Sequence, residues 1–263
     1  MSEPSRANPA AVMAMLARRE WLRLARQPAR IVAAIGTALL LWLVVGGGLG
    51  GSMRLGGTAP TEAANDPVSY ALYLVPGVMT VVAMFAAIFS SIAVIEDRRE
   101  GFLQGVLVAP APRWSIATGI VPGGASVAAA QAALLLPLAW VAGPAIDLPR
   151  AGLALVGVLL AAVALQSLGV AFAWRCRDAA SFHSVMNLLF MPLWLLSDAF
   201  FPVRGAAEPL ATIIRINPLS WCGAVVREAL LGGPLPGLAL LGAAAFAAAS
   251  LGVAVTVVAR GRG

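Results

Sequence analysis

Residues 68–95, VSYALYLVPGVMTVVAMFAAIFSSIAVI, decide the fold of this chain, because they run for 28 positions without a charged side chain. An α-helix of that length extends about 42 Å at ~1.5 Å per residue. Since about 20 apolar residues suffice to cross the hydrocarbon core of a bilayer, the stretch predicts a transmembrane helix that tilts or projects beyond it. The Pro76-Gly77 step is expected to bend this helix near its start.

The composition of the whole chain agrees with a membrane protein. Hydrophobic residues make up 60% and charged residues 11% of the 263 positions, whereas soluble domains contain about 25% charged residues. So strong an excess of apolar residues excludes an ordinary soluble core, a disordered chain and a nucleic-acid-binding protein.

Five other stretches have the length and apolar character of membrane spans or come close to it. They are residues 31–51, 114–141, 153–174, 182–200 and 235–259. The fourth of these is the least regular, because His183, Asn187 and Pro192 interrupt it. The run Pro122-Gly123-Gly124 is expected to loosen the first turns of the second. The expected fold class is therefore all-α, a polytopic membrane protein with six transmembrane helices in a single domain, residues 31–263.

The 18 basic residues predict the orientation, and all of them are arginine. With the six spans in place, 13 arginines fall on the side that carries both termini and five fall on the other side. Because loops on the cytoplasmic side carry the excess of basic residues, both termini are predicted to be cytoplasmic. The expected location is a bacterial cytoplasmic (inner) membrane. The net charge of +6 is then explained by topology and by contact with membrane lipids rather than by nucleic acid.

The first 30 residues are predicted to form a cytoplasmic amphipathic segment. Within it, residues 9–30 mix arginines with Trp21 and Leu22, which suits a helix lying in the membrane interface. A basic tail that only directs the topology is the alternative.

Residues 201–234 are predicted to form a short helical hairpin on the outer side, either re-entrant or external. Two apolar pieces are separated there by the helix-breaking step Asn217-Pro218. A structured external loop without a gating role is the alternative.

No arrangement of residues for catalysis, cofactor binding or metal ligation is found in the sequence. It has one histidine, two distant cysteines, and neither a His-Glu-x-x-His nor a Gly-x-Ser-x-Gly motif. Without a lysine it cannot form the phosphate-binding loop of an ATPase, whose lysine reaches the nucleotide phosphates. The chain is therefore not expected to be an enzyme by itself or to contain a disulfide. Since its first 30 residues lack an apolar core, no cleavable signal peptide is expected either.

Residues 96–101, EDRREG, form the densest charged run, and the apolar segment 102–109, FLQGVLVA, follows them. This segment is too short to cross a membrane, and Pro110 and Pro112 come after it. The pattern predicts a short cytoplasmic helix presented to a soluble partner. An exposed charged cap on the preceding span is the simpler alternative, but it leaves the apolar segment unexplained.

Three stretches of the sequence carry a resemblance to a known family. They are residues 73–79 (YLVPGVM), residues 96–113 (EDRREGFLQGVLVAPAPR) and, between residues 200 and 232, the succession FFP, NPLS and REALLG. Together they resemble the membrane (permease) subunit of the type-2 ABC exporters, which include drug-efflux and nodulation-factor or polysaccharide export permeases. With the six-span layout the resemblance covers nearly the whole chain, and residues 96–113 are its most specific part.

The resemblance implies that two permease chains, identical or related, pair and bind two copies of a separate ABC ATP-binding subunit. That subunit would hold ATP and Mg²⁺, and this chain would hold no cofactor. Residues 96–113 would be the cytoplasmic coupling loop, with its helix resting in a groove of the ATP-binding subunit. The expected contacts are Glu96, Asp97, Arg98, Arg99, Glu100, Phe102, Leu103, Val106, Leu107 and Arg113. The N-terminal interfacial helix would make a second contact through Arg19, Glu20 and Arg23.

The resemblance also implies that the outer hairpin covers the exit of the transport path. The expected gate residues are Asp198, Phe201, Pro202, Asn217, Pro218 and Arg227. Asp198 departs from the family pattern, which often has a small residue, commonly glycine, before the Phe-Pro step. Its carboxylate is either solvated or in contact with a cationic substrate or an arginine of the outer helices.

The expected function is ATP-driven export of a hydrophobic or amphiphilic substrate, such as a drug-like molecule, a lipid or a glycan. A stand-alone secondary carrier or channel is the alternative, and the scarcity of acidic residues inside the spans argues against it. A membrane enzyme or an assembly scaffold is the third alternative, and the enzyme lacks any catalytic arrangement. The predicted pathway consists of generic apolar residues, which do not disclose the substrate.

Overall fold

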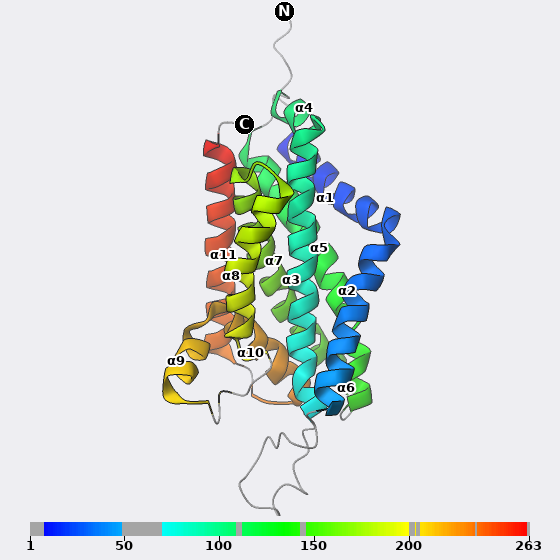
Figure 1. Cartoon of the computed structure of the whole chain (residues 1–263), viewed down its shortest axis with the longest axis vertical. Coiled ribbons are helices and arrows are strands. Elements are labelled where there is room, and N and C mark those ends of the chain that lie inside the picture. Colours follow the sequence, from blue (N-terminus) through cyan, green and yellow to red (C-terminus); the bar gives the residue numbers. More distant parts are fainter. Residues whose placement is uncertain are drawn as a thin grey trace, which may run out of the picture.

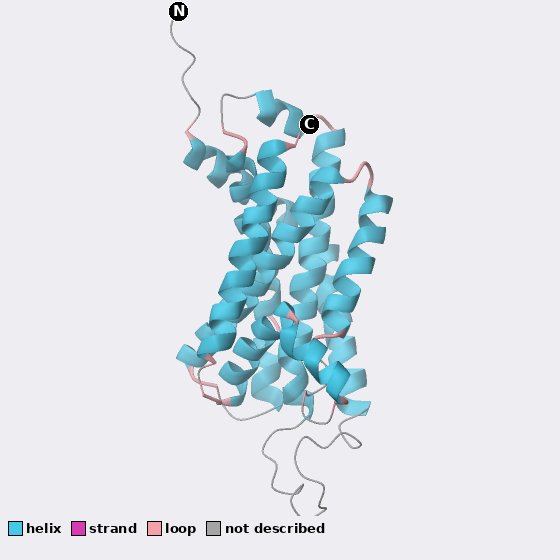
Figure 2. Ribbon diagram, turned by 90° about the vertical axis from the view of Figure 1, so that its left-hand side faces the viewer, coloured by secondary structure: helices cyan, strands magenta, loops and turns pink. Residues whose placement is uncertain are grey.

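The structure, a computed structural model, describes residues 8–48, 70–108, 112–142, 146–199, 203, 206–234 and 236–261. Over these residues it is an elongated bundle of helices, with no strand among them (Figure 1, Figure 2). Long apolar helices able to cross a membrane are α3 (Tyr70–Arg99), α5 (Trp114–Ala133) with α6 (Leu136–Ala142), α7 (Leu148–Arg175) and α11 (Gly237–Arg260). These 4 spans become 6 if each of two bent helix pairs is one span. The prediction of an all-α, multi-pass membrane protein is confirmed at this level.

Helices also occupy the two remaining stretches that the sequence predicts as spans. The described part of the stretch 31–51 lies in α2 (Pro28–Leu41) and the π-helical η1 (Trp42–Gly47), and most of the stretch 182–200 lies in α8 (Ala179–Leu195). Helix α8 has 17 residues and is shorter than the other candidates. The exact number of six spans therefore stays a prediction.

The two ends of the bundle carry different elements (Figure 1). One end, named the α4 end, carries α4 (Phe102–Val108), α1 (Pro9–Arg26) and the last turn of α11. The opposite end, named the α9 end, carries α6, α9 (Glu208–Ile216) and α10 (Pro218–Leu231). Helix α1 and the last turn of α11 thus lie at the same end of the bundle.

Two sharp bends turn α1 and α9 away from the helices that follow them. Helix α1 meets residues 31–47 at 73°, and α9 meets α10 at 82°. Each bend coincides with a proline in the first turn of the following helix, Pro28 and Pro218, because proline lacks the N–H that would continue the hydrogen-bonded ladder. The predicted N-terminal helix and the two helices of the predicted hairpin are present, and their depth in a membrane stays a prediction.

Helix α3 is enclosed by the rest of the bundle, and 83% of its most apolar 18-residue stretch is buried. Helices α5 and α7 both pack against it, and Val75, Val82 and Ala87 have 0% exposed surface. The helix is continuous through Pro76. One unbroken, buried element therefore connects the α9 end with the α4 end.

Helix α5 is not loosened at Pro122-Gly123-Gly124 as the sequence predicts, since it continues to Ala133 before a break ahead of α6. The glycines there serve packing instead. A Cβ added to Gly123 would lie 2.7 Å from the Cα of Ala17, and one added to Gly119 would lie 3.0 Å from the Cα of Met13. Small residues one turn apart let two helix backbones approach closely, so α1 is seated on α5 by these two glycines.

Replacing Gly123 by alanine is expected to weaken the docking of α1 on α5. The added methyl group meets a backbone atom of α1, and overpacking of this kind costs about 1–3 kcal/mol. Gly252→Ala on α11 is the matched control, because nothing lies within 4 Å of a Cβ built there. Thermal unfolding in detergent should show a lower Tm for Gly123→Ala and an unchanged or slightly higher Tm for Gly252→Ala. Equal Tm values for the two variants would contradict this packing.

Candidate functional site

The charged run at the α4 end has an outward and an inward face. Glu96, Arg99 and Glu100 are exposed, whereas Asp97 is 3% exposed and Arg98 is half-buried. Residues 96–99 form the last turn of α3, and Gly101, with a φ of 82°, makes the turn into α4. This left-handed conformation favours glycine, which has no Cβ to clash.

The carboxylate of Asp97 holds α1 against the end of α3. Its Oδ1 accepts hydrogen bonds from Arg19 Nη2 at 2.7 Å and from Arg23 Nη2 at 2.6 Å, and its Oδ2 forms a second ion pair with Arg19. The Arg19 guanidinium also lies 3.9 Å from the centre of the Phe102 ring. One buried acid and one arginine thus join α1, α3 and α4.

A second polar contact between α1 and the bundle starts at Glu20, which is 7% exposed. Its Oε2 accepts a hydrogen bond from Ser90 Oγ at 2.8 Å, and its Oε1 lies 3.4 Å from Arg23 Nη1. The Ser90 hydroxyl in turn accepts from Gln166 Nε2 of α7 at 3.1 Å. Every ionised group of this cluster therefore has a partner inside the protein, as burial demands.

Arg98 binds the C-terminal end of α7. Its Nη1 donates to the carbonyl of Trp174 at 2.7 Å, and its Nη2 donates to the carbonyls of Ala173 at 3.3 Å and of Cys176. These carbonyls have no partner within their helix, so a cation there satisfies them and complements the helix dipole. The last turn of α3 consequently anchors α1 through Asp97 and α7 through Arg98.

Asp178 starts α8 in the short connection that follows. Its Oδ1 accepts from the N–H of Ser181 at 2.7 Å and from the Ser181 hydroxyl at 2.9 Å. These hydrogen bonds lower the pKa of the Asp178 carboxyl. The acid is therefore an N-cap.

The predicted contacts with an ATP-binding subunit fall into two groups. Arg113 is exposed, like the three outward charges, whereas Phe102 and Val106 are half-buried and Leu103 has 0% exposed surface. The side chain of Leu107 lies outside the described part. The predicted second contact, Arg19, Glu20 and Arg23, faces the bundle in the bonds above, so a role in partner contact stays a prediction.

At the α9 end, Asp198 forms an internal ion pair. The residue is 6% exposed and its Oδ2 pairs with Arg227 of α10, whose Nη2 also donates to the Asp198 carbonyl at 2.6 Å. Tyr73 of α3 donates to the same carbonyl at 3.0 Å, and the Arg227 guanidinium lies 4.5 Å from the Tyr73 ring centre. Of the alternatives for Asp198, the arginine contact is the one present, and a solvated carboxylate is wrong.

Asn217 ties the bend between α9 and α10 to the end of α8. Its Nδ2 donates to the carbonyls of Leu193 and Leu196 at 2.7 and 2.9 Å, and its Oδ1 accepts from the N–H of Leu219 at 2.9 Å. It is therefore the N-cap of α10, directly before Pro218. The predicted gate residues Phe201 and Pro202 lie outside the described residues.

Sequence reasoning missed the small residues that let these helices meet. A Cβ on Gly77 would lie 2.2 Å from the Ala199 carbonyl oxygen, and one on Gly223 would lie 2.8 Å from Asp198 Oδ1. The hydroxyl of Ser220 accepts from the N–H of Asp198 at 3.2 Å. The sequence does contain a signal for these contacts, because Gly77, Gly223 and Ser220 are small residues within helices and lie close to the motif residues. Within the described part, no three His, Cys, Asp or Glu residues are grouped to hold a metal ion.

Comparisons with known proteins agree on one family. Residues 12–231 match the family model described as ABC-2 type transporter. The chain is 26% identical over 211 residues to a Cyanophora paradoxa protein named as a transport permease, ycf38, with 79% of this chain and 70% of that protein covered. It is 27% identical over 160 residues to an Escherichia coli K12 protein named as a multidrug ABC transporter permease, YbhR, with 59% of this chain and 42% of that protein covered. The match thus spans less than half the length of YbhR.

Removing the charge of Asp97 is expected to release α1. Asp97→Asn keeps the side-chain shape but weakens its bonds to Arg19 and Arg23, and hydrogen bonds to charged groups contribute about 1.5–3 kcal/mol. The variant should have a lower Tm and faster tryptic cleavage after Arg19 and Arg23. Glu96→Gln, the same charge change on the exposed neighbour, is the control. Equal cleavage rates in both variants would show that Asp97 does not hold α1.

Breaking the Asp198–Arg227 pair is expected to destabilise the α9 end. Asp198→Asn leaves a buried guanidinium without its counter-charge, which costs about 3–5 kcal/mol. The double variant Asp198→Asn/Arg227→Met removes both charges and should recover part of the lost Tm. If the Tm loss of the double variant equalled the sum of the losses of Asp198→Asn and Arg227→Met alone, the two residues would not be coupled.

Proposed function

Because the chain belongs to the ABC-2 type transporter family and is a multi-pass membrane permease, we propose that it is the permease subunit of an ATP-driven exporter. A separate ABC ATP-binding subunit hydrolyses ATP with Mg²⁺, and two permease chains, identical or related, enclose the transport path. The cargo is a hydrophobic or amphiphilic molecule, in line with the multidrug permease named among the relatives. The α4 end faces the cytoplasm of a bacterial cell, as the arginine distribution favours.

The main support for this proposal is the exposed part of the charged run, residues 96–101. Glu96, Arg99 and Glu100 are accessible beside α4, on which Gln104 and Gly105 are exposed as well. This surface lies at the tip of the bundle (Figure 1). Charges of both signs around a short helix suit a polar partner surface, since they fix the register of the contact. The ATP-binding subunit binds there in this proposal.

The contacts behind α4 provide a route by which a partner moves the bundle. Leu103 is fully buried and Phe102 lies under the Arg19 guanidinium, so α4 is packed on the cluster around Asp97. A displacement of α4 therefore shifts the last turn of α3 together with α1, because close-packed interiors transmit strain.

The same movement reaches the α9 end through α3. The helix is continuous from Arg99 back to Tyr73, and Tyr73 contacts both Asp198 and Arg227. Shifting Tyr73 changes the environment of the ion pair that joins the end of α8 to α10. The hairpin of α9 and α10 acts as the outer gate in this proposal, and the Asp198–Arg227 pair holds it in the described conformation.

The alternative, a carrier that works alone on an ion gradient, is disfavoured by the state of the buried acids. Ion-coupled carriers use acidic groups inside the membrane that gain and lose an ion. Among the described residues the buried acids are Glu20, Asp97 and Asp198, and each is bound to an arginine. None is left with a free carboxylate.

The proposal is tested by isolating the tagged chain from its native membranes in mild detergent. A second chain with ATP-hydrolysing activity is expected to remain bound, and this chain, having no lysine, does not supply a phosphate-binding loop. In proteoliposomes the complex should transport a fluorescent amphiphile only with added ATP. Transport by the permease alone, driven by an ion gradient without ATP, would refute the proposal and support the carrier.

The triple variant Glu96→Ala/Arg99→Ala/Glu100→Ala is expected to lose the ATP-binding chain during purification and at least tenfold in ATP-driven transport. Its Tm should stay close to that of the parent, because exposed charges contribute about 0–1 kcal/mol each to stability. The control is Asp147→Ala, an exposed acid at the start of α7 and far from α4. Full transport by the triple variant would rule out this surface as the coupling contact.

A further inference from the structure

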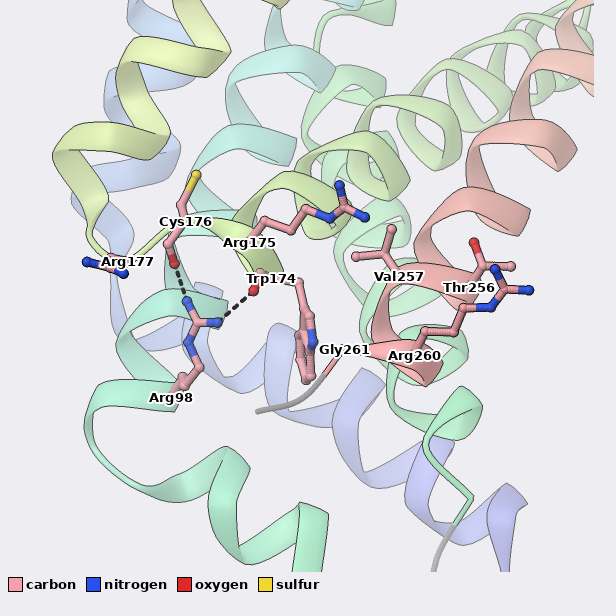
Figure 3. A pocket seen from close by; sticks show the side chains of 9 residues that line it. All are labelled: Arg98, Trp174, Arg175, Cys176, Arg177, Thr256, Val257, Arg260 and Gly261. Carbon is pink, nitrogen blue, oxygen red and sulfur yellow. Dashed lines mark hydrogen bonds between the residues drawn. The ribbon is translucent and has the colours of Figure 1, made fainter.

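A second site lies at the α4 end, between the C-terminal ends of α7 and α11. A cavity of about 700 Å³ opens there, and Figure 3 shows the residues around it. Four arginines line it, Arg98, Arg175, Arg177 and Arg260, together with Trp174. None of its nine lining residues is acidic. The cavity wall therefore concentrates positive charge at the ends of two long helices.

The carbonyls at these helix ends are already bound by other arginines. Arg98 donates to carbonyls at the end of α7, as the dashed lines in Figure 3 show. Arg113 Nη1 donates to the carbonyl of Gly261, just after α11, at 2.9 Å. The usual reason for basic residues in a last turn, compensation of free carbonyls and of the helix dipole, is therefore met without Arg175 and Arg260.

Arg175 and Arg260 thus remain available to a ligand. Both are exposed, and neither forms an ion pair or a hydrogen bond with the described residues. In Figure 3 both side chains extend to the side of the pocket where Thr256 and Val257 lie, whereas Arg177 extends to the opposite side. Two guanidinium groups with free donors beside one cavity suit a phosphate group, which accepts charge-assisted hydrogen bonds.

The wall of the pocket continues into an apolar surface of α11. Val257 lines the cavity, and Val253, one turn towards the middle of the helix, is 47% exposed. Only 22% of the most apolar 18-residue stretch of α11 is buried. This helix therefore presents a largely unpacked apolar face. A ligand that fits both parts has an anionic head at the helix ends and a hydrocarbon chain along α11.

We propose that this pocket binds one anionic phospholipid, with its phosphate between Arg175 and Arg260 and an acyl chain along Val253 and Val257. Ordinary snorkelling of arginines to the membrane surface gives a diffuse attraction to anionic lipids in general, which does not depend on particular arginines and retains no single lipid. A free phosphate ion uses the same guanidinium groups but gains nothing from the apolar wall. Neither the family nor the proposed transport activity enters this inference, which concerns lipid binding alone.

The test measures lipid retention by native mass spectrometry of the purified protein. The chain is mixed in detergent with equal amounts of phosphatidylglycerol and phosphatidylcholine, and one phosphatidylglycerol per chain should be retained preferentially. Arg175→Gln/Arg260→Gln should reduce its affinity about 25-fold, since each arginine near an anionic lipid surface contributes about fivefold. The matched control, Arg18→Gln/Arg26→Gln, removes two exposed arginines of α1 at the same end and should leave the affinity unchanged.

Further variants and a competition experiment distinguish a bound lipid from diffuse attraction or a free anion, and they control for misfolding. Arg175→Lys/Arg260→Lys keeps both charges and should retain most of the binding. If the glutamine double variant does not remain monodisperse, Arg260→Gln alone, at the exposed end of α11, should show about a fivefold loss. Equal losses in the α1 control would show diffuse attraction only and overturn the proposal. Displacement of the lipid by millimolar inorganic phosphate would assign the site to a free anion, and this would also overturn it.

Discussion

The last turn of α3 is the point from which the α4 end of this molecule is organised. Asp97 there accepts hydrogen bonds from two arginines of α1, and Arg98 donates to the carbonyls that end α7. One residue to either side, Glu96 and Arg99 are exposed. Successive residues on a helix point about 100° apart, so a single charged turn both holds helices of the bundle together and presents charge on the surface.

The α9 end follows the same physical rule. Ionised groups removed from water must be paired, and Asp198 is paired with Arg227 while Tyr73 completes the cluster from α3. Close approach of backbones makes these contacts possible, with Gly77 and Gly223 placed where a Cβ would collide with the segment around Asp198. Both polar clusters are thus attached to the two ends of the one helix that the others enclose.

For the proposed exporter, this arrangement offers a physical basis for coupling across the membrane. Helix α3 is continuous between the clusters, and close-packed side chains along it leave little room for independent motion. The lipid pocket proposed beside Arg98 borders the same cluster, because Arg98 connects the end of α3 to the wall formed by Trp174 and Cys176. The exposed charges of the last turn, the cavity between α7 and α11 and the Asp198–Arg227 pair therefore all adjoin one continuous helix.

By itself the sequence determined the all-helical membrane architecture, the charged run before α4, the break at Asn217-Pro218, and the family, because run length, charge and motif order are local properties of a chain. Tertiary structure alone decided which charges face inward. Asp97 and Glu96 are neighbours with similar chemistry, and their different roles follow from arginines that lie more than 70 residues away along the chain. The seat for α1 at Gly119 and Gly123 and the cavity between α7 and α11 likewise arise only where distant helices meet. Local sequence patterns do not indicate which distant helices come into contact, because these contacts depend on how whole helices pack against one another.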